Sequence, residues 1–118
     1  MSTILIVEDD KEVANMLKER LDKEGYTTFL AHTGMEGLKA VNEITPDCIT
    51  LDIYLPDING MEVLKKVKQN NTNIVVIVLT SDDVLEKQAQ QNHADGFLTK
   101  PVNFKKLKSL IETSCKKV

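Results

Sequence analysis

Two stretches of this 118-residue chain, Ile4–Val7 and Ile74–Leu79, are continuously apolar. A strand with one face in water alternates apolar and polar residues, so an unbroken apolar run indicates a strand that is buried on both faces. Such strands are typical of a parallel sheet covered by helices on both sides. Shorter runs at Tyr26–Ala31, Cys48–Leu51 and, more weakly, Gly96–Thr99 bring the number of expected strands to five.

The segments between these runs have the apolar spacing of amphipathic helices. The first places four side chains on one helical face, after Asp10 as the best N-cap candidate: Val13, Met16, Leu17 and Leu21. In the second, Thr33–Glu36 fits a capping box, and the helix should end before Pro46. The third should begin at about Met61, entered through Gly60.

The last two expected helices differ in how firmly they should be anchored. The fourth, from about Asp82 to His93, is polar and has few apolar side chains to bury, so it should be the least firmly docked. The fifth should start at Asn103 as N-cap and bury an apolar stripe of Phe104, Leu107, Leu110 and Ile111.

Five strands that alternate with five helices predict an α/β fold, a three-layer doubly wound parallel sheet. The length suits one domain, residues 1–118. No apolar run approaches the ~20 residues needed to cross a bilayer, and no signal-peptide pattern opens the chain, so we expect no membrane association. Cys48 and Cys115 lack ligand spacing and are interpreted as reduced residues of a cytoplasmic protein.

The charge is unevenly distributed along the chain. Residues 1–59 hold 12 acidic and 5 basic residues, whereas residues 60–118 hold 6 acidic and 10 basic residues. Arg20 is the single arginine, and a basic half made only of lysines lacks the bidentate groups that read bases. The sequence therefore argues against direct nucleic-acid binding by this chain.

Polar residues follow four of the expected strands. They are Glu8, Asp9 and Asp10 after the first, Asp52 after the third, Thr80 and Ser81 at the fourth, and Lys100 and Pro101 after the fifth. Each has a structural interpretation, since acids and hydroxyls cap helices and lysines lie on surfaces. Their occurrence together at the carboxyl edge of one parallel sheet, where ligands bind in such folds, favours a functional site.

The chemistry of these side chains favours magnesium and phosphate. Clustered carboxylates repel one another unless a cation neutralises them, and hard oxygen ligands suit Mg²⁺ better than zinc. A lysine and a hydroxyl beside such an ion would suit a phosphoryl group. Because the sequence has no glycine-rich phosphate loop, one carboxylate is itself the expected phosphoryl acceptor, acting as a nucleophile.

Four motifs in order resemble the response-regulator receiver domains of two-component signalling, over the whole chain. They are Val7-Glu8-Asp9-Asp10, the segment from Asp52 through Pro56 to Gly60, Leu79-Thr80-Ser81, and Gly96-Phe97-Leu98-Thr99-Lys100-Pro101. The resemblance implies the flavodoxin-like strand order 2-1-3-4-5.

The resemblance also implies a role for each site residue. Asp52 would be the phosphoacceptor, and Mg²⁺ would be held by Asp9, by Glu8 through water, by Asp52 and by the backbone carbonyl of Tyr54. Thr80 would move toward the phosphoryl group and Lys100 would pair with it. Phe97 would be an aromatic switch residue, and the Lys100–Pro101 bond would be cis.

The implied function is a signalling switch rather than an enzyme, which catalyses only its own phosphorylation and slow autodephosphorylation. Its phosphodonor would be a phosphohistidine on a sensor histidine kinase or a phosphotransfer protein. Its output would pass through the surface of strands and helices four and five to a downstream protein, a fused output domain or a second copy in a homodimer. The sequence leaves open whether these residues form a stand-alone regulator or part of a longer transcription factor.

Two other classes compete with this interpretation. A magnesium-dependent phosphatase of the aspartyl-phosphate type would use the same nucleophile, but it needs a second aspartate two residues later, where this chain has Tyr54. A flavodoxin-like FMN carrier would need a hydroxyl-rich phosphate loop after the first strand, where Glu8 and Asp9 would repel the phosphate.

Overall fold

The computed structural model describes residues 2–115, in which strands and helices alternate. The elements are β1 (Thr3–Val7), α1 (Lys11–Lys23), β2 (Thr27–Ala31), α2 (Gly34–Ile44), β3 (Cys48–Leu51), α3 (Gly60–Asn70), β4 (Val75–Thr80), a 3-10 turn (Asp83–Leu85), α4 (Glu86–Gln91), β5 (Gly96–Thr99) and α5 (Phe104–Ser114). The strands form one parallel sheet in the order β2-β1-β3-β4-β5, which confirms the expected fold class.

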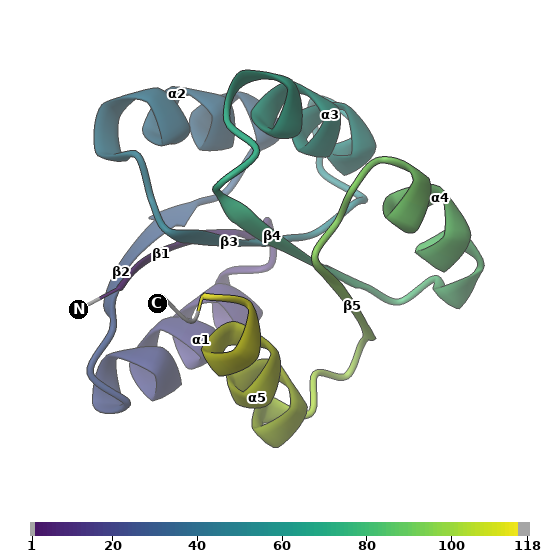
Figure 1. The fold of residues 1–118 in the computed structure, drawn as a ribbon. Coiled ribbons are helices and arrows are strands. Elements are labelled where there is room, and N and C mark those ends of the chain that lie inside the picture. Colours follow the sequence, from purple (N-terminus) through teal and green to yellow (C-terminus); the bar gives the residue numbers. More distant parts are fainter. Residues whose placement is uncertain (1, 116–118) are drawn as a thin grey trace.

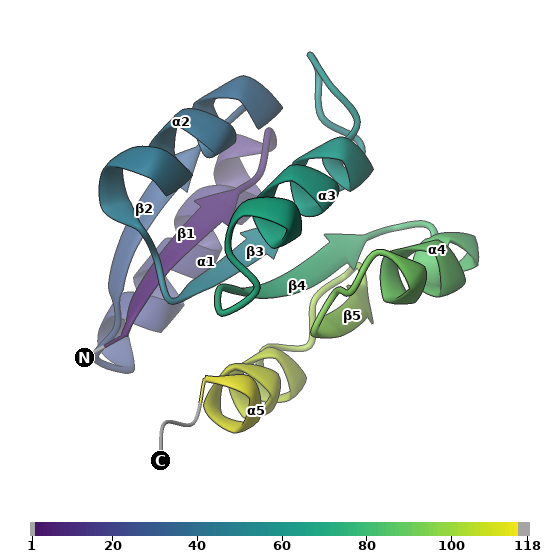
Figure 2. The same ribbon diagram turned by 45° about the horizontal axis from the view of Figure 1, so that its top comes forward.

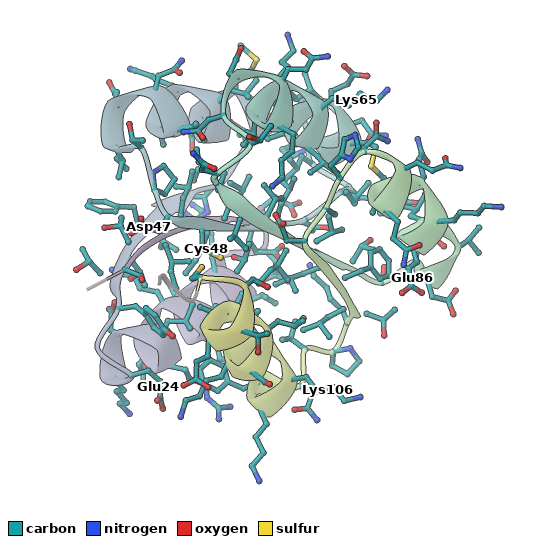
Figure 3. The ribbon with its side chains drawn as sticks, in the orientation of Figure 1. Glu24, Asp47, Cys48, Lys65, Glu86 and Lys106 are labelled. Carbon is teal, nitrogen blue, oxygen red and sulfur yellow. The ribbon has the colours of Figure 1, made fainter. Side chains whose placement is uncertain are left out.

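Helices cover both faces of this sheet. Helices α1 and α5 lie on one face, and α2, α3 and α4 lie on the other, as two views of the ribbon show (Figure 1, Figure 2). Side chains of a strand point alternately to the two faces, so continuous apolar strands supply both cores. Leu5 and Ile49 belong to the core under α2–α4, whereas Ile4 and Cys48 belong to the core under α1 and α5. Figure 3 places Cys48 next to the end of α5.

Three expected helix caps are present. The Asp10 carboxylate accepts hydrogen bonds from the backbone N–H groups of Glu12 and Val13, at 3.0 and 3.2 Å. The Thr33 hydroxyl caps α2 and the Asn103 side chain caps α5. The capping box is incomplete, however. The Glu36 carboxylate accepts from the N–H of His32, one residue before Thr33, so it ties the preceding loop to the helix.

Some packing expectations were wrong. Met16 is 44% exposed, and Ala14 is buried on α1 in its place beside Leu17 and Leu21. On α5 only Leu107 and Ile111 are buried, while Phe104 and Leu110 are half-buried at the rim of the core.

The fourth helical segment is shorter than expected. It is a 3-10 turn followed by the six-residue α4, and Ala89 is the one buried residue of α4. The expectation of weak docking is therefore supported by its packing.

Strand register determines which side chains meet at the carboxyl edge. Val7 of β1 lies beside Leu51 of β3, so the next residues along each strand, Glu8 and Asp52, emerge next to each other. The chain leaves β1 toward β2 on one side and leaves β3 toward β4 on the other, so the two connections run in opposite directions from this edge. Such a switch point is where parallel α/β sheets bind ligands.

Candidate metal and phosphoacceptor site

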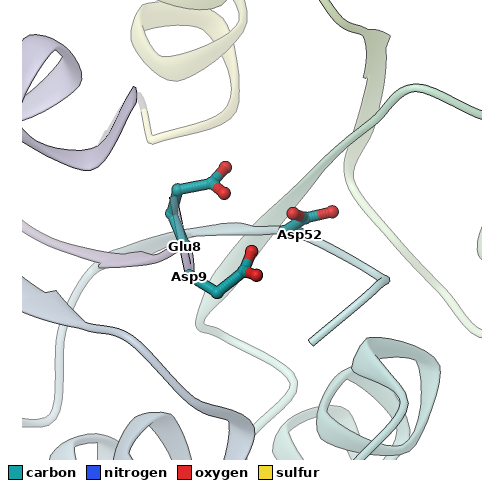
Figure 4. A group of neighbouring side chains, drawn as sticks. All are labelled: Glu8, Asp9 and Asp52. Carbon is teal, nitrogen blue, oxygen red and sulfur yellow. The ribbon is translucent and has the colours of Figure 1, made fainter. Parts of the chain in front are cut away.

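Three carboxylates converge at this edge of the sheet (Figure 4). One oxygen from each of Glu8, Asp9 and Asp52 lies within 4.8 Å of the other two. Glu8 and Asp52 are buried, whereas Asp9 is exposed. The cluster therefore has one side that faces solvent and could exchange ligands with it.

Lys100 bridges the two buried carboxylates. Its Nζ atom lies 2.7 Å from a Glu8 oxygen and 3.0 Å from an Asp52 oxygen. The lysine follows β5, which pairs with β4 so that the backbone N–H of Lys100 donates to the carbonyl of Thr80. The peptide bond from Lys100 to Pro101 is cis, as expected. Residues 92 positions apart in the sequence are thus brought into one ion-paired group.

Burial and charge shift the ionisation of this group. The pKa of Glu8 is raised to about 7, mainly by burial, with a smaller contribution from the nearby Asp52 carboxylate, while hydrogen bonds from Lys100 and from the Asp10 N–H oppose the shift. Burial lowers the pKa of Lys100, but its bonds to Glu8 and Asp52 outweigh that effect, so the pKa is raised overall. The lysine therefore stays charged, and a second cation beside it would favour ionised Glu8.

The loop after β3 holds the Asp52 side chain in place. One Asp52 oxygen accepts a hydrogen bond from the backbone N–H of Tyr54 at 3.3 Å. Gly60 packs directly against this loop, and its N–H donates to the carbonyl of Ile53 at 2.7 Å. A Cβ atom at Gly60 would lie 2.6 Å from Cα of Ile53 and would collide with the Asp52 carbonyl oxygen, which explains the glycine.

Thr80 and Phe97 lie on the paired strands β4 and β5. Thr80 ends β4 and is fully buried, and its hydroxyl lies 3.5 Å from the N–H of Asp82. Phe97 lies on β5 opposite Val78 and is half-buried against the core under α2–α4.

Two contacts around the site were not foreseen from the sequence. His32 is half-buried, and its Nδ1 lies 3.0 Å from the backbone carbonyl of Glu8. The Asp57 carboxylate accepts hydrogen bonds from the N–H groups of Gly34 and Met35, so the loop after β3 is tied to the start of α2. Asp57 lay inside a recognised motif, but no spacing in the sequence predicted its partner.

Fold and site together define a flavodoxin-like α/β domain with an acidic cluster and a lysine at its switch point. Residues 4–112 match the family described as the response regulator receiver domain. Response regulator ArlR of Staphylococcus saprophyticus is 34% identical over 108 residues, covering 91% of this chain and 49% of that protein. Response regulator MprA of Mycobacterium ulcerans is 36% identical over 106 residues, covering 88% of this chain and 46% of that protein.

Solved structures agree with the sequence relatives. A CheY-like receiver domain protein from Methanospirillum hungatei superposes with a TM-score of 0.93 at 32% identity, covering 98% of this chain and 94% of that one. Response regulator TrrA from Thermotoga maritima, solved in complex with Mg²⁺ and BeF, gives a TM-score of 0.90 at 32% identity, covering 97% of this chain and 99% of that one.

The chain belongs to the response regulator receiver domain family. It is a receiver domain of two-component signalling, and it spans about half the length of the relatives ArlR and MprA. No helix within residues 2–115 is long and apolar enough to cross a membrane.

Proposed function

We propose that Asp52 accepts a phosphoryl group from a phosphohistidine on a sensor histidine kinase or a phosphotransfer protein, in a step that needs Mg²⁺. The observation that carries the proposal is the position of Lys100 between Glu8 and Asp52, beside the exposed Asp9. Asp52 contacts both the lysine and the loop N–H of Tyr54, so both of its oxygens are oriented. An oriented carboxylate next to a fixed cation can attack phosphorus while the cation stabilises the transferred charge.

The donor atoms fit a magnesium ion. Glu8, Asp9, Asp52 and the backbone carbonyl of Tyr54 would hold it, and all of these ligands are hard oxygens. When bound, Mg²⁺ supplies positive charge for the transferred phosphoryl oxygens. Lys100 alone cannot neutralise three carboxylates, so the cluster has the negative charge that a divalent cation requires. The relative TrrA was solved with Mg²⁺ and BeF.

Phosphorylation would change the conformation of the domain through Thr80, Lys100 and Phe97. A new dianion on Asp52 attracts the ammonium of Lys100 and a hydroxyl donor. Thr80 supplies a buried hydroxyl at the end of β4, the strand beside β3. Its movement toward the phosphoryl group would open space that the Phe97 ring enters from β5. The surface of α4, β5 and α5 would then change, because α4 buries only Ala89 and can shift at low cost.

This surface would act on a protein partner. The partner would be a separate downstream protein, an output domain in the same polypeptide, or a second receiver in a homodimer. Residues 1–118 would form the receiver unit, located in the cytoplasm, without direct nucleic-acid contact of its own. Apart from catalysing its own phosphorylation and slow autodephosphorylation, the domain would not act as an enzyme.

The phosphatase alternative is not supported by the residue at its acid–base position. That mechanism needs a carboxylic acid two residues after the nucleophile, and Tyr54 is 54% exposed there with its hydroxyl bonded to Asp82. The FMN alternative conflicts with the charge after β1, where Glu8 and Asp9 would repel a phosphate.

Labelling with a small phosphodonor tests the proposed function. Acetyl phosphate with Mg²⁺ should add about 80 Da, one phosphoryl group, to the intact protein. Asp52→Asn should lose this mass shift, and Asp9→Ala should lose it because the metal site is incomplete. Asp83→Asn is the control and should label like the wild type, since it removes an exposed carboxylate from the segment after β4. Unchanged labelling of Asp52→Asn, or labelling with excess EDTA, would contradict the proposal.

A further inference from the structure

We propose that Cys48 and Cys115 form a reversible intramolecular disulfide that fastens the end of α5 to β3. The two are the only cysteines in the sequence, and neither is in a disulfide in this structure. They lie far apart in the sequence, and nothing in the receiver function described above uses them. The site is therefore separate from the acidic cluster.

The two thiols are in direct contact. Cys48 begins β3 and is fully buried in the core under α1 and α5, and Cys115 packs against the same core from the C-cap position of α5. The side chains are hydrogen-bonded to each other. Figure 3 shows Cys48 next to the last turn of α5. Thiols already in contact need little chain movement to reach bonding distance, and Cys115 at the end of a helix can supply it.

The two cysteines differ in access, which gives them different roles. Cys115 is half-buried, so it is the more accessible of the two to a small oxidant. Cys48 is enclosed by the core, and the hydrogen bond to Cys115 together with burial raises the pKa of its thiol. Cys115 is consequently the residue that is oxidised first, and Cys48 is the residue that resolves the product.

Hydrogen peroxide is the oxidant for which the step is written. The sulfur of Cys115 attacks one peroxide oxygen, the O–O bond breaks, and a water molecule leaves with the thiol proton, giving a sulfenic acid. The sulfur of Cys48 then attacks the sulfenic sulfur. The S–S bond forms as the S–O bond breaks, and a second water leaves with the proton of Cys48. Two thiols are oxidised by two electrons and one peroxide is reduced to two waters.

The bond would restrict the end of a helix that is otherwise held by few side chains. Leu107 and Ile111 are the buried residues of α5, and Cys115 lies one turn beyond Ile111. A covalent link there joins α5 to the strand that leads to Asp52, four residues after Cys48. Oxidation would therefore stabilise the α1–α5 side of the molecule against unfolding.

Mass spectrometry of the intact chain tests the proposal. The native protein is treated with a small excess of hydrogen peroxide, then unfolded in denaturant with iodoacetamide, so that buried thiols are also trapped. We expect a monomer about 2 Da lighter, from the loss of two hydrogens, that takes up no alkyl group. Dithiothreitol should restore two alkylatable thiols. The oxidised protein should also melt several degrees higher than the reduced protein.

Cys115→Ser and Cys48→Ala are the variants that separate the outcomes. Cys115→Ser removes the accessible sulfur at a partly exposed position, and its Cys48 should remain alkylatable after the same treatment. Cys48→Ala should stop at the sulfenic acid on Cys115, which dimedone traps. Two alkylatable thiols in the treated wild type, a sulfinic acid on Cys115 about 32 Da heavier, or a disulfide-linked dimer would each overturn the proposal.

Discussion

The Tyr54 hydroxyl donates a 2.7 Å hydrogen bond to the Asp82 carboxylate, which joins the loop after β3 to the loop after β4. Each partner also contacts a site residue through its backbone. The N–H of Tyr54 bonds to Asp52, and the N–H of Asp82 lies 3.5 Å from the Thr80 hydroxyl. The bridge therefore spans the two loops that flank the proposed phosphoacceptor.

Removing the bridge should shorten the lifetime of phosphorylated Asp52. Tyr54→Phe keeps the ring and deletes the hydroxyl, so the two loops can separate and water can reach the acyl phosphate more easily. We expect hydrolysis to be several-fold faster, measured as loss of the phosphoryl mass after the phosphodonor is removed. Asp82→Asn keeps a carbonyl oxygen that can accept the bond and should be affected less. Equal lifetimes in Tyr54→Phe and the wild type would show that the bridge does not limit water access.

The buried Glu8 should make metal-free stability depend on pH. Its pKa is 4.5 ordinarily and about 7 in the folded protein, so between these values the folded chain holds a proton that the unfolded chain has released. Stability from this group is present below about pH 4.5 and is lost as the pH rises through 7. The change is about 3 kcal/mol, from 1.36 kcal/mol per pKa unit.

Glu8→Gln should remove this dependence. The free energy of unfolding of the variant minus that of the wild type should increase between pH 4.5 and 7.5, as measured by urea denaturation with EDTA present. Excess Mg²⁺ should stabilise the wild type alone and shrink the difference above pH 7. Glu19→Gln, at an exposed position on α1, is the control and should show no such trend. A constant difference across this range would contradict the raised pKa.

Lys68 should be essential for stability although it is far from the carboxylate cluster in the fold. Its ammonium is buried, and it donates to an Asp95 oxygen at 2.6 Å and to the carbonyl of Ile74 at 2.7 Å. Lys68→Met removes this donor from the Ile74 carbonyl and from Asp95, which keeps only the bond from the Val76 N–H to that oxygen. We expect a loss of about 2 kcal/mol, less than for a fully enclosed pair because the Asp95 side chain is 34% exposed.

Lys65→Met on the same helix is the matched control for this test. The Lys65 side chain is 41% exposed and pairs with Glu62 at 3.7 Å, a contact that contributes little in water. Chemical denaturation of both variants compares them directly. Equal losses of stability would mean that the buried contacts of Lys68 do not hold α3 to the loop before β5.

Gly60→Ala should disturb the phosphoacceptor loop. The added methyl collides with backbone atoms of Asp52 and Ile53, which cannot rotate away as a side chain could. We expect a loss of about 1–3 kcal/mol in stability and slower labelling by acetyl phosphate. Gly96→Ala is the comparison, because its methyl would meet the end of the Leu110 side chain at 3.2 Å. If both variants lose the same stability and label equally fast, backbone crowding at Gly60 is not the reason for the glycine.

The sequence predicted the features that depend on local pattern and spacing. Continuous apolar strands led to the parallel sheet, and the acids and lysine after those strands led to the residues that the fold brings together. Asp10 and Asn103 were found as caps because a cap lies next to the helix that it starts. Strand order came from the resemblance and not from the pattern.

Features that depend on tertiary contacts could not be predicted in this way. The bond between His32 and the Glu8 carbonyl, and the two bonds that Asp57 makes to α2, join segments that only the complete fold brings together. Met16 has the helical spacing of a core residue, but the buried face of α1 runs through Ala14, Leu17 and Leu21 and leaves it exposed. The fourth helix was predicted too long because its polar sequence contains no strong stop signal.

The single buried residue of α4 has a consequence for how such domains diversify. Positions 86–91 contribute only Ala89 to the core, so five of the six side chains are free to vary without weakening the sheet or moving the acidic cluster. Recognition specificity can therefore change there independently of phosphoryl chemistry. Exchanging these five side chains between two receivers should redirect a signal to another partner while each protein keeps its own rate of phosphorylation.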